Sequence, residues 1–411
     1  MTTRTLVERR RAPSYRELLL LEGFAPLAAA ALCARVAISM GQVTVVLLVL
    51  QQYRSPGLAG LAVCMSIGPG LLVSPLAGAL LDRHPRVLLI RLDHVVAAVS
   101  MLTIAALSGA GRLSPWMLLT ALAVSSLTAP LSDTGSRAML PAVVPCRLWD
   151  KANALDSGGY VLAALLGPPL GGALIASSGP AVAIVVIGML YAAAALCVGG
   201  VLDPRRDTTR SGALTGRILD GLGYVVHHRV LRGLAVCVSL RNLGPGVLVV
   251  ALPALAVQRL HAGPEVIGLL FAVLGVAGMV SGVASGSAST VGRERNLLAA
   301  AVATSALGLA VVATSDTMVQ AVTGMVVIGL STGPLDVSLF SLRQRCTDAD
   351  VQGRAFAVSM SLNYLGLPLG SALAGPLVQW SAQAALGIAA AVTAAAAVLG
   401  LVLLPRTVTS R

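Results

Sequence analysis

Charged residues are scarce in this sequence. Asp, Glu, Lys and Arg make up 11% of the 411 residues, whereas soluble domains contain roughly a quarter. Hydrophobic residues make up 56% and the mean hydropathy is +0.86, so a soluble fold would have too little polar surface. Aromatic residues reach only 3%, which leaves no stacking platform for nucleic-acid bases despite the formal net charge of +12. These shortages exclude a soluble class and predict a membrane protein without a nucleic-acid partner.

Motifs of enzymes and metal sites are also missing. The sequence has no G-x-x-x-x-G-K-[ST] loop for ATP and no H-E-x-x-H. The six cysteines show no C-x-x-C or Cys/His spacing, and most lie in apolar segments, as small packing residues do. We therefore expect neither an enzyme nor a metal, and no cofactor.

Long apolar runs dominate what is present. A membrane-spanning helix needs about 20 apolar residues, and the sequence predicts twelve, at 24–50, 57–80, 88–110, 114–135, 152–176, 179–201, 231–257, 264–288, 297–315, 318–340, 355–378 and 384–404. The first run is too long for a signal-peptide core, so we expect it to be retained. The one long polar connection, 202–230, predicts a linker and an amphipathic surface helix between an N-terminal half, 1–201, and a C-terminal half, 231–411.

Cationic residues alternate in density along this pattern. If the N-terminus is cytoplasmic, 24 Lys and Arg fall on cytoplasmic segments and 3 on outer loops. Because cytoplasmic loops carry the excess of Lys and Arg, both termini are predicted to be cytoplasmic. An even number of spans is required for that orientation.

The two halves repeat each other. Residues 167–174 and 366–373 both read G-x-P-L-G-x-A-L. Three glycines of the second apolar run also recur in the eighth at an offset of 208, as Gly60, Gly70 and Gly78 against Gly268, Gly278 and Gly286. Two six-helix repeats with a binding site between them are a known transporter plan.

A short charged turn, Gly78-Ala-Leu-Leu-Asp-Arg-His-Pro-Arg86, separates the second and third runs. Its spacing, G-x-L-x-D-R-x-x-R, resembles the loop 2–3 signature of the major facilitator superfamily of secondary transporters. The resemblance implies an all-α fold of twelve transmembrane helices in two pseudo-symmetric halves that work by alternating access.

The same turn is a candidate gate that would hold the cytoplasmic side closed in the outward-facing state. Gly78 would let helices approach closely, Asp82 could cap a facing helix, and Arg83 and Arg86 would pair with Asp133, with Arg137 one turn further on. An anchor turn without a gating role is the alternative.

Two further motifs extend the resemblance. Gly167-Pro168-x-x-Gly171-Gly172, repeated as Gly366 and Gly370, resembles the superfamily's antiporter signature, and ordinary small-residue helix packing is the alternative. The run 133–172 and Gly353-Arg354-Ala-Phe-Ala resemble the drug-efflux branch that contains macrolide-type and multidrug exporters. This likeness implies export.

Two arginines lie deep within predicted spans, Arg35 in the first and Arg241, beside Asn242, in the seventh. Ionisable groups inside the membrane are costly and are functional hypotheses by default. In the resembled fold these helices flank the cavity, so facing arginines would form a bidentate anion clamp; bonding to backbone carbonyls, or snorkelling, is the alternative. Other polar groups expected at cavity depth are Gln42, Asn363 and Tyr364.

A proton-coupled transporter needs a titratable acid with access to the cavity. The candidates are Asp93, beside His94, Asp133 and Asp156, although each lies near a predicted helix end, where ion pairing is the alternative. Drug–proton antiporters of the superfamily commonly carry an acid in helix 1 or 4, whereas helix 1 here carries Arg35. Protons therefore remain a candidate coupling ion only.

Together these features predict a monomeric secondary transporter of a bacterial inner membrane that uses the proton motive force to export drugs or small amphipathic metabolites. Its partners would be the lipid bilayer, a small-molecule substrate and protons. One alternative is an exchanger or uniporter of an anionic metabolite or lipid-like anion held by Arg35 and Arg241. The other is a non-transporting membrane sensor or assembly partner.

Overall fold

The computed structural model describes residues 14–201, 223–286, 292–347 and 352–405, which contain helices and no strand. The long helices are α3 (Phe24–Tyr53), α4 (Pro56–Arg83), α5 (Arg86–Gly109), α6 (Pro115–Val143), α7 (Trp149–Ser178), α8 (Pro180–Gly199), α10 (Arg229–Gln258), α11 (Pro264–Gly286), α12 (Glu294–Ala313), α13 (Met318–Cys346) and α16 (Ala382–Leu403). The shorter ones are α2 (Tyr15–Leu19), the 3-10 turn η1 (Cys146–Leu148), α14 (Gln352–Tyr364) and α15 (Gly366–Trp380).

Eleven helices in the described part of the chain are long and apolar enough to cross a membrane. The remaining predicted span, 355–378, is the eleventh in chain order and is formed by α14 and α15 together, which are separated only by Leu365. Pro368 has no N–H to donate to the carbonyl of Tyr364, so the helical ladder is interrupted there. The predicted twelve-helix membrane fold is thus confirmed, with its eleventh span broken near the middle.

Several helices begin where the sequence supplies a cap. The hydroxyl of Ser55 accepts a hydrogen bond from the N–H of Leu58, with Pro56 at the first helical position of α4. Thr317 and Gln320 form a reciprocal capping box at the start of α13. Serine and threonine satisfy exposed N–H groups at these ends, so the turns between spans are short and well defined.

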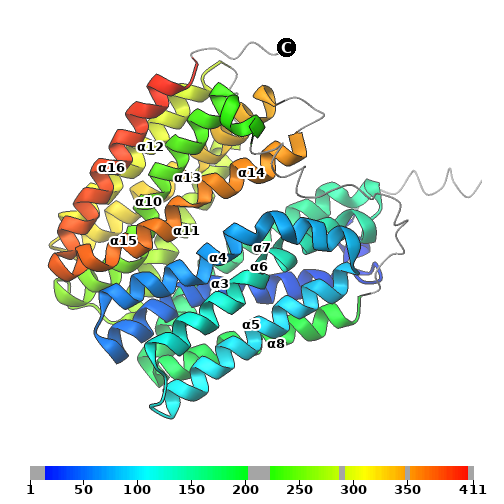
Figure 1. Ribbon diagram of the computed structural model, residues 1–411, viewed down its shortest axis with the longest axis horizontal. Helices are drawn as coiled ribbons and strands as arrows, with labels where there is room; N and C mark the ends of the chain where they lie inside the picture. The colour runs from blue at the N-terminus through cyan, green and yellow to red at the C-terminus, as the bar shows by residue number, and fades with distance from the viewer. Residues whose placement is uncertain (1–13, 202–222, 287–291, 348–351, 406–411) are drawn as a thin grey trace, which may run out of the picture.

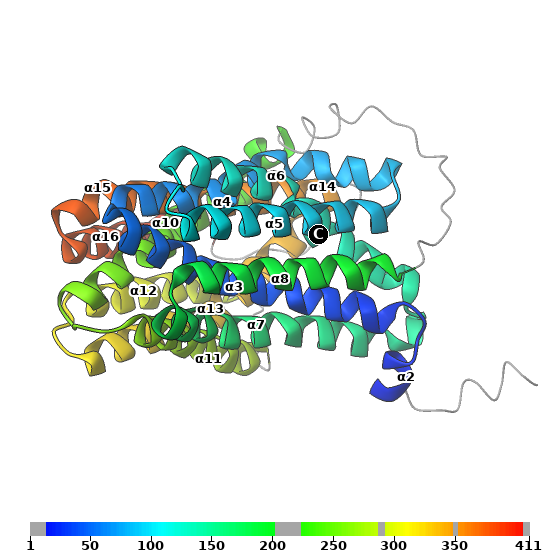
Figure 2. The ribbon, with the colours of Figure 1, turned by 90° about the horizontal axis from the view of Figure 1, so that it is seen from below.

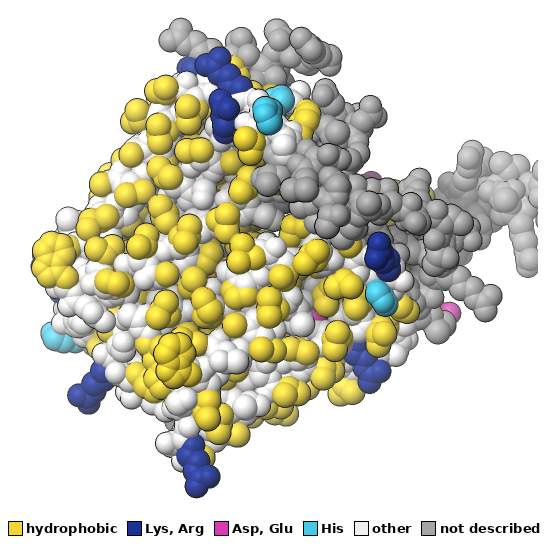
Figure 3. Space-filling view, in the orientation of Figure 1, with side chains coloured by type: hydrophobic (Ala, Val, Ile, Leu, Met, Phe, Trp, Pro, Cys, Tyr) yellow, Lys and Arg dark blue, Asp and Glu magenta, His cyan; other side chains and the backbone are white. Residues whose placement is uncertain are grey.

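Helices α3 to α8 form one group and α10 to α16 another, as Figure 1 shows. The groups meet mainly where α7 packs on α11 and α4 packs on α15. Their axes diverge away from the contact between the start of α4 and the end of α15 (Figure 1). In Figure 3, hydrophobic side chains cover the visible face, and Lys and Arg lie near its edges, as expected for a surface in contact with lipid.

Glycine contacts between the groups follow the internal repeat. A Cβ on Gly60 of α4 would overlap the carbonyl oxygen of Ser371 in α15, and a Cβ on Gly268 of α11 would overlap that of Pro168 in α7. The two glycines are the repeat-related pair at an offset of 208. Each glycine lets two helix backbones meet directly. The two groups therefore touch through two repeat-related contacts, both at the same end of the molecule.

The predicted division of the chain at 202–230 stays a prediction. Residues 202–222 lie outside the described residues, and so does most of the expected surface helix. Residues 223–227, just before α10, are helical.

Candidate functional site

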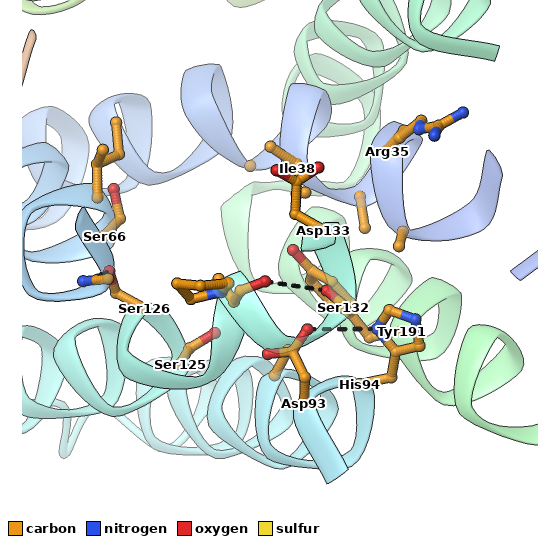
Figure 4. Close-up of a pocket in the computed structure, with 18 of the residues that line it drawn as sticks. Arg35, Ile38, Ser66, Asp93, His94, Ser125, Ser126, Ser132, Asp133 and Tyr191 are labelled. Carbon is orange, nitrogen blue, oxygen red and sulfur yellow. Dashed lines mark hydrogen bonds and ion pairs between the residues drawn. The ribbon is translucent and has the colours of Figure 1, made fainter. Parts of the chain in front are cut away.

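A cavity of about 370 Å³ lies within the first group of helices (Figure 4). Its walls come from α3, α4, α5, α6, Tyr160 of α7, and α8. Ala, Val, Ile, Leu and Met side chains provide most of the lining, and serine hydroxyls from α4 and α6 are set among them. Two of the predicted cavity residues, Arg35 and Gln42, line it, whereas Arg241, Asn242, Asn363 and Tyr364 do not.

Arg35 of α3 is held by α7. Its two terminal nitrogens donate to the carbonyl oxygen of Asp156 at 2.8 Å and to the carboxylate Oδ1 of Asp156 at 2.6 Å. The guanidinium also lies 3.7 Å from the centre of the Tyr160 ring, a cation–π contact. Asp156 is thus the ion-pair partner of the buried arginine.

A second polar group lies beside the first. Tyr160 donates to Oδ1 of Asp133 at 3.0 Å and accepts from Arg137 at 2.7 Å. Arg137 and Asp133, one turn apart on α6, form an ion pair at 3.8 Å. Sequence reasoning missed Tyr160, although its position four residues after Asp156 places both on one face of α7.

Asp93 and His94 of α5 form the third polar group. The Asp93 carboxylate accepts from the hydroxyl of Thr128 at 2.6 Å, and its second oxygen lies 3.6 Å from His94 Nδ1. Asp93 is 3% exposed and His94 2% exposed, although both line the cavity. Figure 4 shows Ser132 and Tyr191 close to this pair. An acid therefore lies buried in the cavity wall. Its place near a predicted helix end had indicated an interfacial ion pair as the alternative.

The C-terminal polar residues form a separate cluster. Arg241 donates to Oδ1 of Asn242 at 2.9 Å, and Nδ2 of Asn242 donates to the carbonyl oxygen of Asn363 at 2.9 Å. The amide of Asn363, oriented to satisfy its neighbours, accepts from Arg343 at 2.6 Å. Tyr364 is 47% exposed. The predicted clamp of Arg35 and Arg241 is not formed, because each guanidinium is bonded by residues of its own half.

The contacts predicted for the closed gate are not formed in this conformation, and the gate stays a prediction. Arg86 donates to the carbonyl oxygen of Ala138 at 2.7 Å instead of pairing with Asp133. Arg83 is exposed and has no ion-pair partner among the described residues. A Cβ on Gly78 would meet nothing within 4 Å in the described part of the chain, so no helix there approaches it closely. The side chain of Asp82 lies outside the described residues.

The glycine motifs of α7 and α15 do lie in close helix contacts. Added Cβ atoms would collide with atoms of α3 at Gly167 and Gly171, with α11 at Gly172, and with α10 at Gly366 and Gly370. Pro168 is buried in the same face of α7. In the described part of the chain, no three His, Cys, Asp or Glu side chains are grouped to hold a metal ion.

Comparison with known proteins places these features in context. Residues 19–410 match the family model described as "Transmembrane secretion effector". The chain is 35% identical over 395 residues to an uncharacterized MFS-type transporter, y4rN, of Sinorhizobium fredii, covering 95% of this chain and 97% of that protein. It is 26% identical over 346 residues to the multidrug efflux pump Tap of Mycobacterium tuberculosis, covering 80% and 81%.

Solved structures share the fold at low sequence identity. A mutant form of the nucleoside transporter NupG superposes with a TM-score of 0.75 at 12% identity, covering 93% of this chain and 99% of that one. A bacterial homologue of the human lysosomal transporter Spinster, in an inward-facing and unoccupied conformation, gives a TM-score of 0.69 at 12% identity, covering 92% and 94%.

Proposed function

The chain belongs to the major facilitator superfamily of multi-pass membrane transporters, which are not enzymes, and we propose that it is a proton-driven exporter of small amphipathic molecules. Export is supported by the likeness to the efflux pump Tap. We place both termini in the cytoplasm and the chain in a bacterial inner membrane, as the distribution of arginine and the bacterial relatives suggest.

The nature of the cavity supports an amphipathic substrate. Its volume of about 370 Å³ falls within the range of small-molecule sites. The walls are largely apolar, with hydroxyls that could bond a few polar groups. Such a lining suits a drug-like molecule better than a densely charged metabolite.

Charge balance favours neutral or cationic substrates. Arg35 is paired with Asp156, and Arg137 with Asp133. These pairs leave Asp93 as a cavity acid whose only ion-pair partner among the described residues is His94. An anionic substrate would have to displace Asp156 from Arg35. The alternative of an anion exchanger therefore loses its main support, which was a free pair of arginines.

In this proposal Asp93 is the coupling acid. The position of its carboxyl in the cavity wall is the observation on which the proposal rests. The carboxyl lines the cavity, is shielded from the membrane, and has Thr128 and His94 as neighbours. Intramembrane acids in transporters commonly relay protons. Alternating access would let Asp93 bind a proton from one side and release it to the other, with substrate competing for the deprotonated state.

The test measures dye accumulation in efflux-deficient bacteria that express the wild type, Asp93→Asn or Asp150→Asn, with and without a protonophore. Asp150 is an exposed acid in the first turn of α7, outside the cavity, and is the matched control. We expect the wild type and the control to lower accumulation of a cationic dye in a protonophore-sensitive way, and Asp93→Asn to lose this effect. Full export by Asp93→Asn at normal expression would refute Asp93 as the coupling acid.

A non-transporting role predicts a different result. A sensor or assembly partner would leave accumulation of every dye unchanged in the wild type. The same assay therefore separates that alternative from the proposed exporter.

A further inference from the structure

A second cavity, of about 480 Å³, lies beside the first between α2, α3, α6 and α7. Its lining is almost wholly apolar, and the charged residues among it are Arg35 and Asp156. Neither the gate turn nor the proposed coupling acid contributes to it. The proposed transport cycle leaves this space without a role.

The two cavities share a wall. Ala31, Arg35 and Ser136 line both of them, whereas Tyr160 lines only the first, and Asp156 only the second. The guanidinium of Arg35 therefore has Tyr160 on one side and Asp156 on the other. The side chain of Arg35, held by these two residues of α7, forms the partition.

The outer side of the second cavity faces apolar surroundings. Leu155 and Leu162 of α7 line it and are 38% and 40% exposed, and Leu19 of α2 is 49% exposed. Leu155 and Leu162 belong to a membrane-length helix, so their exposed surface would contact lipid. The cavity is thus open toward the hydrocarbon layer instead of toward water alone.

Helix α2 lies next to α3 and α7 (Figure 2), and its Tyr15 and Leu19 line this cavity at the end that is cytoplasmic in the proposed orientation. It is fixed there by an ion pair between Glu17 and Arg147 and by Lys151, whose Nζ lies 4.4 Å from the centre of the Tyr15 ring. These contacts bind the segment before the first span to η1 and the start of α7. They define one rim of the opening.

We propose that the second cavity is a side entrance through which the apolar part of the exported molecule passes from the cytoplasmic leaflet into the central cavity. The inference rests on the proposed export function and names its substrates as amphipaths that partition into the membrane. The shared wall at Arg35 favours this occupant, because only the Arg35 side chain separates a molecule in the second cavity from the first cavity. Displacement of that side chain would join the two spaces.

Glycines supply a clean test. Gly158 of α7 lines only the second cavity, and a Cβ there would meet nothing within 4 Å, so Gly158→Leu should fill the entrance without disturbing the fold. Gly387 of α16 is also a helical glycine whose added Cβ meets nothing within 4 Å, and it lines neither cavity. Gly387→Leu is therefore the matched control. Ala154→Leu, on an exposed residue of the same lining, is a second blocking variant.

Export of two probes is measured for each variant at equal membrane expression. Hoechst 33342 partitions into lipid, and ethidium carries a permanent charge and enters from water. We expect Gly158→Leu and Ala154→Leu to slow Hoechst 33342 export roughly five- to a hundredfold, as steric overpacking of the path would do, with ethidium export and the control variant unchanged.

Three other outcomes are informative. No export of either probe by the wild type would overturn the proposed export of membrane-partitioning amphipaths, and with it the entrance that rests on it. Unchanged export of Hoechst 33342 by both blocking variants, with a working wild type, would overturn the entrance alone. An equal loss of export for both probes would also overturn the entrance. Such a result would show a general defect, or the loss of a structural lipid, instead of a blocked route from the membrane.

Discussion

Gly268→Ala should shift the transporter away from the conformation described here. A Cβ at Gly268 would overlap the carbonyl oxygen of Pro168 and lie 2.9 Å from the carbonyl carbon of Pro168 and from the Cα of Pro169. All three are backbone atoms, so no side chain can rotate to relieve the clash. Overpacking of this kind costs roughly 1–3 kcal/mol.

The cost applies to only one state, because the contact joins the two groups of helices at the end where they touch. In a conformation with those ends apart, α11 and α7 would separate and the methyl group would be accommodated. A difference of 1–3 kcal/mol changes the ratio of the two states by roughly 5–150-fold. The touching ends lie on the outer side in the proposed orientation, so the variant should favour the outward-open state.

Thiol labelling measures this shift. Gln42 is exposed and lines the central cavity, so Gln42→Cys reports access to the cavity by a membrane-impermeant maleimide added to intact cells. Gly282→Ala, on the same helix and with nothing within 4 Å of the added Cβ, is the control. We expect faster labelling with Gly268→Ala than with Gly282→Ala, over the background of protein without the new cysteine. Equal rates and equal thermal stability would refute the packing argument.

Two further predictions concern polar contacts. Tyr160→Phe keeps the ring beneath Arg35 but removes both hydrogen bonds of the hydroxyl, so we expect export to weaken while thermal unfolding in detergent changes little; a variant that unfolds as early as one lacking the whole ring would contradict this. Glu294 is 3% exposed and pairs with Arg345, so Glu294→Gln should lower the unfolding free energy by about 1.5–3 kcal/mol, the value of a charge-assisted hydrogen bond. An unchanged melting temperature would show that the pair contributes nothing.

Much of the architecture could be read from hydropathy alone. Inside a lipid bilayer, a single segment satisfies its backbone hydrogen bonds by forming a helix. Each long apolar run therefore specifies a span almost independently of the other runs. The predicted span 264–288 begins at Pro264, where α11 begins. The predicted and observed ends differ where polar residues continue a helix beyond its apolar part, as at α13, which runs to Cys346 instead of ending near 340.

The site was harder to predict, because partners of buried polar groups come from other helices. Arg35 and Asp156 were each recognised as notable, yet their pairing depends on the rotation of α3 against α7. Arg35 and Arg241 lie in the corresponding helices of the two halves, and a clamp between them was one hypothesis, but each is bonded within its own half. Sequence spacing reports the depth of a residue along a helix and does not report its direction across the bundle.

The sequence by itself determined that this chain enters the membrane, how often it crosses and which helix faces bear small residues, because these properties depend on local composition and length. Only the tertiary structure decided which charges neutralise one another, that Asp93 lies in the wall of a cavity, and that Arg35 separates two cavities. Those properties depend on how helices distant in sequence turn toward each other. That rotation is set by close contacts such as those of Gly167 and Gly366, whose partners no local pattern identifies.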